Sequence, residues 1–378
     1  MEHKKLGDIA TYVNGYAFKP EDRGTKGLPI IRIQDLTGNS YDLGFYNGEY
    51  PKKIELNNGD ILISWSASLG VYEWNRGKAL LNQHIFKAVF DKLDVNKKYF
   101  VFAVKYNLKE MEKRTHGATM KHITKKDFDN VLVPFPPLNK QQEIAATLDK
   151  LQSIITHRRT QLEKLDLLVK ARFVEMFGDP NDTSRDKEKR HKIGELCDVT
   201  KLAGFEFTEY INYQDSGEII MLRGLNCKQG KLILDNVKYI DRETSHKLPR
   251  SRLYIGDILM TYAGTIGDVA MVDENDKYHL APNVAKISII NKKKLSPVFL
   301  VHLFMYSHDY IMSFVSQVAQ ASINMQKIRN FEYAIPSIEE QYEFEKFVQQ
   351  VDKSRVAIQN DLEQAQMLFD SLMQEYFG

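Results

Sequence analysis

The stretch Pro136-Pro137-Leu138-Asn139-Lys140-Gln141-Gln142-Glu143 opens a long helical pattern, and its frame returns later in the chain. The proline, the apolar residue, the glutamine and the glutamate reappear as Pro336, Ile338, Gln341 and Glu343. The first copy closes on Phe177-Gly178 and the second on Phe377-Gly378. The sequence therefore predicts two related segments that each end in a long helix.

The repeat also extends into the segments that precede the helices. Gly59-Asp60-Ile61-Leu62 returns as Gly256-Asp257-Ile258-Leu259, and Met120-Lys121-His122-Ile123 returns as Met325-Gln326-Lys327-Ile328. A repeat of this length exceeds the 20 to 50 residues of a solenoid unit. It has the usual size of a domain, roughly 180 residues. We therefore expect a duplicated domain with pseudo-symmetry, which suits a partner that also has two halves.

The composition is that of a globular protein with two hydrophobic cores. The chain has 378 residues, of which 43% are hydrophobic and 11% aromatic, and a formal net charge of only +2. This charge neither requires nor excludes binding to nucleic acid. Two cysteines are too few for a disulfide framework or a thiolate zinc site. Because we find no apolar run of about 18 residues and no signal peptide, we expect no contact with a membrane and a cytoplasmic location.

Short β-branched runs bounded by turn residues predict strands in both copies. They are Pro29–Ile33, Gly59–Ser64 and Ile85–Phe90 in the first copy and Ile219–Leu222, Gly256–Met260, Asp268–Val272 and Val284–Ile289 in the second. Helices are expected near Tyr99–Arg114 and Pro297–Gln317. Each globular part is therefore expected to be α+β, with a core built mainly from strands.

The two long helices show a heptad pattern over about five repeats, which is typical of a coiled coil. The residues expected in the helix-pair interface are Leu148, Leu151, Ile155, Leu162, Leu165, Val169, Val351, Ile358, Leu362, Phe369 and Leu372. Arg158, Arg172 and Arg355 occupy polar positions of the pattern. A helix of about 38 residues rises roughly 57 Å. If the helices pair antiparallel, they would place the globular parts at opposite ends; the simpler reading is a helix pair that only joins two units.

Local signals set the expected boundaries of these segments. Asn139-x-x-Gln142 and Ser337-x-x-Glu340 resemble capping boxes, and Gly178 is a suitable helix-ending glycine. Asp179 to Lys192 is a charged linker. The predicted organisation is a first globular domain at 1–136, a long helix at 137–178, a linker at 179–192, a second domain at 193–336 and a final helix at 337–378.

Motifs of common enzymes are missing. The sequence contains no phosphate-binding Gly-x-x-x-x-Gly-Lys-Ser/Thr loop and no His-Glu-x-x-His zinc motif. Ala263-Gly264-Thr265-Ile266-Gly267 lacks the lysine and the spacing of a nucleotide site, and it predicts a tight turn. The Asn/Asp-Pro-Pro-Tyr/Phe motif of amino-methyltransferases is also absent. We therefore expect no catalytic residue, no metal and no cofactor in this chain.

Polar residues that could read base edges gather in equivalent loops of the two copies. In the first copy the candidates are Arg32, Gln34, Ser64, Trp65, Ser66, Gln83, His84, His116, Lys121 and His122. In the second copy they are Arg223, Asn226, Thr261, Tyr262, Thr265, Asn283, Ser322, Asn324, Gln326 and Lys327. Lys125, Lys126 and Arg329 would suit phosphate contacts, which position a protein without specifying a sequence.

The frame residues match between the copies, whereas the loop residues mostly differ. Gly-Asp-Ile-Leu and the proline before each helix recur, while Arg32-Ile33-Gln34-Asp35 is matched by Arg223-Gly224-Leu225-Asn226. An ordinary solvated loop would also contain such polar residues. The motif residues are the same in both copies, whereas the polar loop residues differ. This combination nevertheless favours one scaffold that reads two different sequences.

At this point the chain strongly resembles the specificity (S) subunit of Type I restriction–modification systems. The resemblance covers nearly the whole chain and rests on an ordered series of motifs rather than on any single one. The motifs are Leu6-Gly7-Asp8-Ile9, Gly59-Asp60-Ile61-Leu62, Gly117–Ile123, Pro136–Ile144, Gly264-Thr265-Ile266-Gly267 and Ala321–Met325. The loop Gln320-Ala321-Ser322 departs from the first copy, because it lacks the equivalent of His116-Gly117.

The resemblance implies a function in recognising double-stranded DNA. Each globular part would be a target recognition domain that reads one half of a bipartite sequence, and the paired helices would set the spacer between the halves. Two modification (methyltransferase) subunits would dock on the chain and supply adenine methylation, and restriction subunits would supply translocation and cleavage. The target adenine would be flipped into a methyltransferase subunit.

Two other readings remain open from the sequence. The chain could be the specificity module of a related defence or methylation system that does not restrict DNA. It could also be a coiled-coil scaffold without DNA specificity, which would show no sequence preference even when its partner subunits are present. A fused methyltransferase–specificity enzyme is disfavoured, because the methyltransferase motif is missing and the chain has no spare length.

Overall fold

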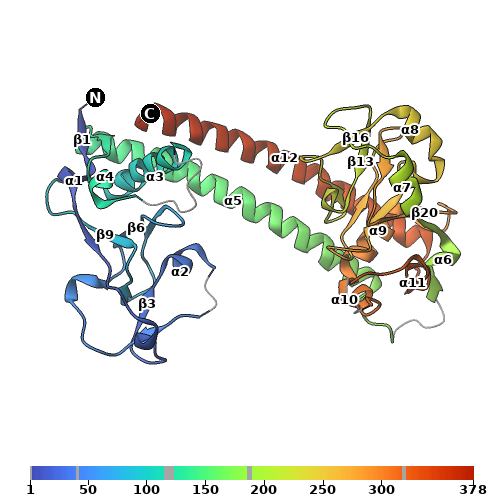
Figure 1. Ribbon diagram of the computed structural model, residues 1–378, viewed down its shortest axis with the longest axis horizontal. Coiled ribbons are helices and arrows are strands. Elements are labelled where there is room, and N and C mark those ends of the chain that lie inside the picture. The colour runs from blue at the N-terminus through green and yellow to red at the C-terminus, as the bar shows by residue number, and fades with distance from the viewer. Residues whose placement is uncertain (1, 40–41, 115–122, 185–189, 317–320) are drawn as a thin grey trace. The chain divides into compact units, whose positions relative to one another are not determined.

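The structure is a computed structural model, and it describes residues 2–39, 42–114, 123–184, 190–316 and 321–378 (Figure 1). The chain divides into two compact units. Unit 1 comprises residues 1–160 and 359–378, and unit 2 comprises residues 161–358. The boundaries fall inside the two long helices, so each unit contains a globular part and one half of each long helix.

Unit 1 contains two four-stranded sheets and a small strand pair. Its elements are β1 (His3–Lys5), α1 (Leu6–Ile9), β2 (Thr11–Asn14), β3 (Leu28–Ile31), α2 (Ile33–Thr37), β4 (Phe45–Tyr46), β5 (Glu55–Leu56), β6 (Ile61–Ser64), β7 (Gly70–Glu73), β8 (Ala79–Leu81), β9 (Ile85–Val89), α3 (Lys97–Arg114), α4 (Lys125–Asp129) and β10 (Leu132–Pro134). The strand orders are β2-β9-β6-β7, β4-β3-β8-β5 and β1-β10. All pairs are antiparallel except β3 with β8.

Unit 2 repeats this arrangement. Its elements are β11 (Arg190–Lys192), α6 (Ile193–Leu196), β12 (Cys197–Lys201), α7 (Gly204–Tyr210), β13 (Ile219–Leu222), β14 (Cys227–Lys228), β15 (Lys231–Leu232), β16 (Lys238–Ile240), α8 (Arg242–Lys247), β17 (Ile258–Thr261), β18 (Val269–Met271), β19 (Tyr278–Leu280), β20 (Val284–Ile289), α9 (Pro297–Tyr306), α10 (His308–Met312), α11 (Met325–Arg329) and β21 (Glu332–Ala334). Its sheets are β12-β20-β17-β18, β16-β13-β19, β14-β15 and β11-β21. The parallel pair β13–β19 corresponds to β3–β8 in unit 1. The predicted α+β fold with two pseudo-symmetric domains is confirmed.

The recurring Gly-Asp motif makes the same turn in both units. Gly59 and Gly256 have φ angles of 87° and 88°, a left-handed conformation that L side chains rarely adopt. The following aspartates accept backbone hydrogen bonds, from Asn57 N to Asp60 Oδ2 at 2.9 Å and from Tyr254 N to Asp257 Oδ2 at 2.8 Å. In each unit the glycine forms the turn and the carboxylate holds it, and a central strand of the sheet, β6 or β17, follows.

Most predicted strands are present, with small shifts at their ends. Strands β13 and β20 have the predicted bounds, whereas β3 ends at Ile31 because Arg32 precedes the short helix α2. The helical structure expected near Pro297–Gln317 is present as two helices, since α9 ends at Tyr306 and α10 begins at His308. The break lies at Ser307, whose buried hydroxyl is 2.8 Å from the hydroxyl of Tyr333.

The two long helices are α5 (Leu138–Phe177) and α12 (Ile338–Phe377). Ser337 and Glu340 form the predicted capping box, with Ser337 N donating to Glu340 Oε2 at 3.0 Å and Glu340 N to Ser337 Oγ at 3.3 Å. The capping box expected at Asn139 is wrong, because Asn139 already lies inside α5 after Pro137. Gly178 ends α5 with a φ of 81°, as predicted.

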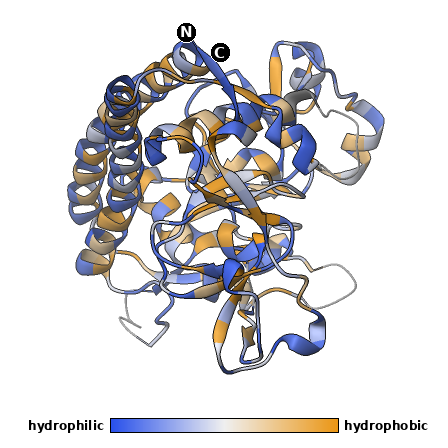
Figure 2. Cartoon of the chain, turned by 90° about the vertical axis from the view of Figure 1, so that its left-hand side faces the viewer, coloured by the Kyte–Doolittle hydropathy of each residue, from blue (hydrophilic) through white to orange (hydrophobic). Residues whose placement is uncertain are grey.

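The helices pair antiparallel. In unit 1 the first half of α5 packs against the last half of α12, and both join a core with α3 and the sheet β2-β9-β6-β7. In unit 2 the last half of α5 packs against the first half of α12, together with α9. Hydrophobic and hydrophilic segments alternate along both helices in Figure 2, as a heptad pattern requires.

Each residue expected in the helix pair is buried or half-buried. Leu148, Ile155, Val169, Val351 and Phe369 are buried, and Leu151, Leu162, Leu165, Ile358, Leu362 and Leu372 are half-buried. The heptad list lacked Phe173, which is fully buried, and Met373 and Phe377, which are 6% and 5% exposed.

Each arginine at a polar heptad position forms an ion pair between the two helices. Arg158 pairs with Asp361 at 2.8 Å in unit 1. In unit 2, Arg172 pairs with Glu343 at 2.8 Å and Arg355 with Asp166 at 2.7 Å. These arginines interrupt the apolar pattern at positions where the facing helix offers a carboxylate.

One buried glutamine ties each long helix to its globular part. Gln141 Oε1 accepts from Asn96 N at 3.0 Å, and its Nε2 donates to Pro136 O at 2.9 Å. Gln341 Oε1 accepts from Ser296 N at 2.8 Å, and its Nε2 donates to Lys294 O and Pro336 O. The glutamine of the repeated motif thus fixes the entry of the helix against the loop that precedes α3 or α9. Among the described residues, no helix is both long and apolar enough to cross a membrane.

Candidate functional site

Three loops of unit 1 meet at Trp65, the residue that follows β6. Its backbone N donates to His84 O at 3.3 Å, and Ile123 N donates to Trp65 O at 2.9 Å. These two bonds join the β6 loop to the turn before β9 and to the segment that leads into α4. The loop after β6 and the turn at His84 therefore lie together in unit 1, beside Ile123; residues 116–122 of the third predicted loop lie outside the described residues.

The same two bonds occur at Tyr262 in unit 2. Tyr262 N donates to Asn283 O at 3.0 Å, and Ile323 N donates to Tyr262 O at 2.9 Å. His84 and Asn283 both have left-handed backbones, with φ of 70° and 66°. Histidine and asparagine are among the non-glycine residues that tolerate this region. The same backbone hydrogen bonds and the same left-handed residue thus hold these loops in both units.

Ser64 and Thr261 hold the loops and are not available to a ligand. Both are fully buried. Ser64 Oγ donates to Ser68 O at 2.5 Å, and Thr261 Oγ1 bonds to the carbonyl of Thr265 and accepts from Asp268 N at 2.9 Å. The two hydroxyls bond the loop backbone and hold its conformation, and they form no part of its exposed surface.

Arg32 and Asn226 are also buried, at 9% and 0% exposed. Arg32 Nε lies 3.1 Å from Asp35 Oδ2. Asn226 Oδ1 accepts from Arg223 N at 3.1 Å, and its Nδ2 donates to Ile233 O at 2.7 Å. Asp35 and Asn226 occupy equivalent positions and make the same cap to the arginine backbone. They belong to the frame, although the sequence placed Asn226 among the recognition residues.

The remaining candidates differ in exposure. Gln34, His84, Thr265, Asn283, Asn324 and Gln326 are exposed, Trp65, Gln83, Arg223, Tyr262, Ser322 and Lys327 are half-buried, and Ser66 is buried. Two of these also support the frame, because Asn324 Oδ1 accepts from Lys327 N at 2.9 Å and Lys327 Nζ donates to Phe314 O at 2.6 Å. His116, Lys121 and His122 lie outside the described residues.

The two central aromatics are held differently. The Trp65 ring stacks on Phe86 with centroids 5.5 Å apart and lies 4.9 Å from the His84 ring. The Tyr262 ring has Lys201 Nζ 5.4 Å from its centroid, and its hydroxyl accepts from Asn283 N at 3.3 Å. Both side chains are half-buried rather than buried, and an aromatic ring at such a position is of a type that packs against a base or sugar.

In unit 2 the loops enclose a hollow of about 420 Å³. Three candidates from three different loops line it: Arg223, Thr265 and Asn283. Phe207, Tyr213 and Leu225 complete its wall, and these residues were not proposed from the sequence. The closely spaced aromatic residues Phe205, Phe207, Tyr210 and Tyr213 are the sequence signal that could have pointed to this wall.

Two of the three cations proposed for phosphate contacts form bonds within the protein. Lys125 Nζ pairs with Asp129 at 2.5 Å, and the Arg329 guanidinium donates to Val199 O. Lys126 is exposed. These bonds are compatible with surface cations that orient a bound polyanion, and they add no sequence information.

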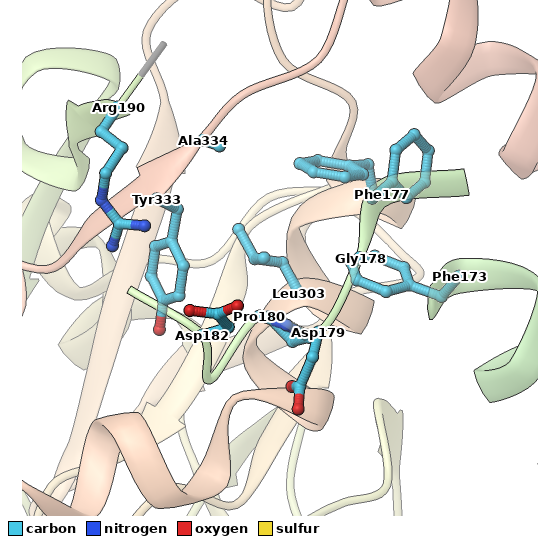
Figure 3. A pocket seen from close by; sticks show the side chains of 11 residues that line it. Phe173, Phe177, Gly178, Asp179, Pro180, Asp182, Arg190, Leu303, Tyr333 and Ala334 are labelled. Atoms are coloured by element: carbon cyan, nitrogen blue, oxygen red, sulfur yellow. The ribbon is translucent and has the colours of Figure 1, made fainter. Parts of the chain in front are cut away.

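Metal-ligand clusters and reactive thiols are common components of catalytic sites. Within the ranges that the structure describes, no three His, Cys, Asp or Glu side chains come together as metal ligands. Burial raises the pKa of Cys197 and of Cys227 to about 12, so neither thiol is a ready nucleophile. A small cavity where α5 ends has Phe173 and Phe177 on one side and Arg190 and Tyr333 on the other (Figure 3). Its volume of about 30 Å³ leaves room for about one water molecule.

Comparison with known proteins places this arrangement in a family. The sequence profile described as "Type I restriction modification DNA specificity domain" matches residues 1–165 and 186–365. The chain is 27% identical to the Type I restriction enzyme EcoBI specificity subunit of Escherichia coli, over 98% of this chain and 84% of that protein. It is 26% identical to the MjaVIII specificity subunit of Methanocaldococcus jannaschii, over 77% and 71% of the two chains.

The fold is also similar to that of a solved S subunit. The crystal structure of the Type I restriction–modification S subunit from M. genitalium aligns with a TM-score of 0.58 at 14% sequence identity. The alignment covers 100% of this chain and 96% of that one. With a family profile that matches both halves of the sequence, the chain belongs to the Type I restriction–modification DNA specificity family.

Proposed function

We propose that this chain is the non-catalytic subunit that reads DNA sequence for a Type I restriction–modification complex. Residues 1–136 and 193–336 are the two target recognition domains, and each reads one half of a bipartite site. The observation that carries the proposal is the equal frame around Trp65 and Tyr262. The same backbone bonds hold loops whose exposed side chains differ between the units.

The chemistry of the exposed side chains fits this role. Amides such as Gln34 in unit 1 and Asn283 in unit 2 can bond the edge of adenine, and Arg223 can donate to guanine. The partners are double-stranded DNA, methyltransferase subunits that provide adenine methylation, and restriction subunits. Because the net charge is only +2, this chain alone binds DNA weakly and the complex provides much of the phosphate neutralisation.

Mapping of methylated adenines tests the proposal directly. The chain is co-expressed with the methyltransferase subunit encoded beside it, and host DNA is analysed by long-read sequencing. We expect one bipartite motif with a fixed gap, and its loss when this chain is omitted. Methylation that is unchanged without this chain would contradict the proposal and favour a scaffold.

Exchange of one domain tests the assignment of one half-site to each unit. Residues 1–135 are replaced by the equivalent segment of another specificity subunit. We expect a change in one half of the methylated motif and none in the other. A change in both halves would rule out two independent readers.

The helix pair sets the spacer in this proposal. Inserting four residues near Thr160 lengthens α5 by roughly 6 Å, nearly two base-pair steps. A matched insertion near residue 360 of α12 keeps the two helices equal in length. We expect a longer gap in the methylated motif with both half-sites unchanged, whereas an unchanged gap would dismiss the helices as the ruler.

A further inference from the structure

The equivalent arginines of the two units, Arg32 and Arg223, have different charged surroundings. In unit 1, Arg32 is 9% exposed, and its Nε lies 3.1 Å from a carboxylate oxygen of Asp35. In unit 2 the position of Asp35 is taken by Asn226, which makes the same cap to the arginine backbone but has no charge. Within the ranges that the structure describes, Arg223 forms no ion pair, so its charge is not compensated by a neighbouring carboxylate.

The guanidinium of Arg223 has donors that the protein does not use. Its Nη2 donates to Asn236 O at 2.8 Å and to Asn236 Oδ1 at 3.0 Å. Among the described residues, neither its buried Nε nor its Nη1 has a hydrogen-bond partner. A buried charged donor without a partner is costly. Asn236 therefore fixes the position of the guanidinium, which is then suited to an acceptor that comes from outside the chain.

Arg223 lies in the wall of the hollow of about 420 Å³ in unit 2, among residues that are mostly apolar or aromatic. The rings of Phe207 and Tyr213 have centroids 5.7 Å apart in this wall. Burial raises the pKa of Tyr213, and the positive charge of Arg223 opposes that rise, so the guanidinium lies near this ring. A cation thus stands beside an apolar wall, where the low local dielectric strengthens a hydrogen bond to a ligand.

The residue two positions after each arginine also differs between the units. In unit 1 it is Gln34, an exposed amide. In unit 2 it is Leu225, which is 53% exposed and lines the hollow. An amide can bond the edge of adenine, whereas an apolar side chain can contact the 5-methyl group of thymine. The same loop therefore offers chemistry for different bases in the two units.

The major-groove edges of the bases decide which of them fit the hollow. Guanine presents two acceptors there, N7 and O6, and the guanidinium of arginine has donors only. Thymine presents a methyl group, which suits the apolar wall. A guanine beside a thymine would thus match both the unused donors of Arg223 and the exposed side chain of Leu225.

We propose that the hollow of unit 2 takes the edges of a guanine and a neighbouring thymine, with Arg223 donating to the guanine and Leu225 packing against the thymine methyl group. The inference rests on the proposed function and adds the bases that unit 2 reads. Arg223 and Leu225 are then residues that determine the sequence of one half-site.

Mapping of the methylated motif is the first test. The chain is co-expressed with the methyltransferase subunit, and host DNA is sequenced for the unmodified chain and for Arg223→Met and Leu225→Ala. The controls Arg242→Met and Ile290→Ala replace an exposed arginine and an exposed apolar residue of unit 2 that do not line the hollow. Thermal unfolding that matches the unmodified chain shows that the variants are folded.

We expect a guanine next to a thymine in the half-site that stays unchanged when residues 1–135 are exchanged. Arg223→Met is expected to relax the preference at the guanine alone, and Leu225→Ala the preference at the thymine alone. Both controls should keep the complete motif, because their side chains lie outside the hollow.

Synthetic duplexes that carry the mapped motif test each contact separately. We expect binding of the unmodified complex to weaken about tenfold when adenine replaces the guanine, because O6 is lost as an acceptor. Deoxyuridine lacks only the methyl group of thymidine, and it should weaken binding about fourfold. The complex with Arg223→Met should not distinguish guanine from adenine, and the complex with Leu225→Ala should not distinguish thymine from uracil.

A half-site of unit 2 without guanine would overturn the role of Arg223, and one without a thymine beside the guanine would overturn the role of Leu225. If Arg223→Met lowered methylation at all sites and left the motif unchanged, the arginine would be a phosphate contact and the inference would be wrong. If the unmodified chain yields no bipartite motif, the proposed function fails instead, so the two failures are distinguishable.

Discussion

The residue after strand β6 in unit 1 is Trp65, and its counterpart after β17 in unit 2 is Tyr262. Both donate and accept the same two backbone bonds, yet Trp65 stacks on Phe86 while Tyr262 lies beneath Lys201. The neighbouring buried hydroxyl, Ser64 or Thr261, closes the same loop in each unit. The backbone and the buried polar groups therefore hold these loops in place, and the exposed positions can differ between the units.

Each unit also contains a natural probe that the other unit lacks. The two tryptophans, Trp65 and Trp74, lie in unit 1, and the two cysteines, Cys197 and Cys227, lie in unit 2. Because both thiols are buried with a raised pKa, their labelling under native conditions requires local opening of unit 2. Tryptophan fluorescence reports on unit 1. With these probes, the effect of a mutation on each unit can be measured separately.

The largest expected difference concerns Phe173 and its counterpart Met373. The Phe173 ring is fully buried, and four other aromatic rings lie with centroids 5.1 to 5.7 Å away. We expect Phe173→Ala to cost about 3–5 kcal/mol and Met373→Ala about 2–3 kcal/mol in free energy of unfolding. Urea unfolding measures both values. Faster thiol labelling in Met373→Ala than in Phe173→Ala would contradict the placement of Phe173 in the core of unit 2.

The repeated glutamines come next. Gln341 makes three hydrogen bonds and Gln141 two, and both are buried. Replacing either with methionine keeps the volume but leaves buried backbone groups unpaired. We expect losses of about 3 kcal/mol for Gln341→Met and about 2 kcal/mol for Gln141→Met. Thermal unfolding checks the values. If Gln341→Met were as stable as the unmodified chain, the hydrogen bonds of Gln341 would be dispensable for stability.

Acid is expected to weaken unit 2 more than unit 1. Burial lowers the pKa of His279 and of His302 in unit 2, where Lys286 lies near the first and Asp352, Lys231 and Arg355 near the second. Histidines 3, 84 and 157 of unit 1 are exposed. A lowered pKa in the folded state favours the neutral ring. The contribution of each histidine to the free energy of unfolding is therefore fully present above 6.5, the pKa of an unfolded histidine. It is lost as the pH falls from 6.5 through the lower pKa of the folded state.

Thiol labelling between pH 7 and pH 5 measures this loss, after correction for the intrinsic reactivity of a thiol in an unfolded peptide. The matched variant carries His279→Leu and His302→Phe, which place the residues of unit 1, Leu80 and Phe102, at the equivalent positions. We expect the variant to open less readily in acid. An unchanged dependence on pH would assign the loss to other groups.

The smallest effect is expected from the ion pairs between the helices. Arg355 in unit 2 and Arg158 in unit 1 each face a carboxylate that is more than half exposed. Exposed pairs contribute about 0–1 kcal/mol, so Arg355→Ala and Arg158→Ala should each cost no more than about 1 kcal/mol and depend on salt. Urea unfolding at two salt concentrations checks this. A loss of several kcal/mol in either variant would mean that the pair specifies the alignment of the helices.

The frame of the molecule could be predicted because its signals are local. The heptad pattern gave the helices α5 and α12 to within one residue of the expected bounds, and Gly59-Asp60 and Gly256-Asp257 gave the turn that starts a central strand. Periodicity, a positive φ and a helix-ending glycine each depend on a few neighbouring residues. These features need no knowledge of what packs against them.

The surface of the site could not be predicted in the same way, because burial depends on distant segments. Ser64, Thr261 and Asn226 are polar loop residues by sequence, yet each is fully buried because other segments close over it. Phe207, Tyr213 and Leu225 were overlooked, yet they line the hollow beside Arg223. The break between α9 and α10 lies at Ser307, whose buried hydroxyl bonds the hydroxyl of the distant Tyr333.

The duplication, the long helices and the positions of the loops could thus be predicted from short-range patterns and from the similarity of the two halves of the chain. Which loop side chains face solvent, and which apolar helix residues, such as Leu167 and Met367, lie outside the helix-pair interface, became known from the folded structure alone. Whether a side chain is desolvated depends on its neighbours across the fold and not on its neighbours in sequence.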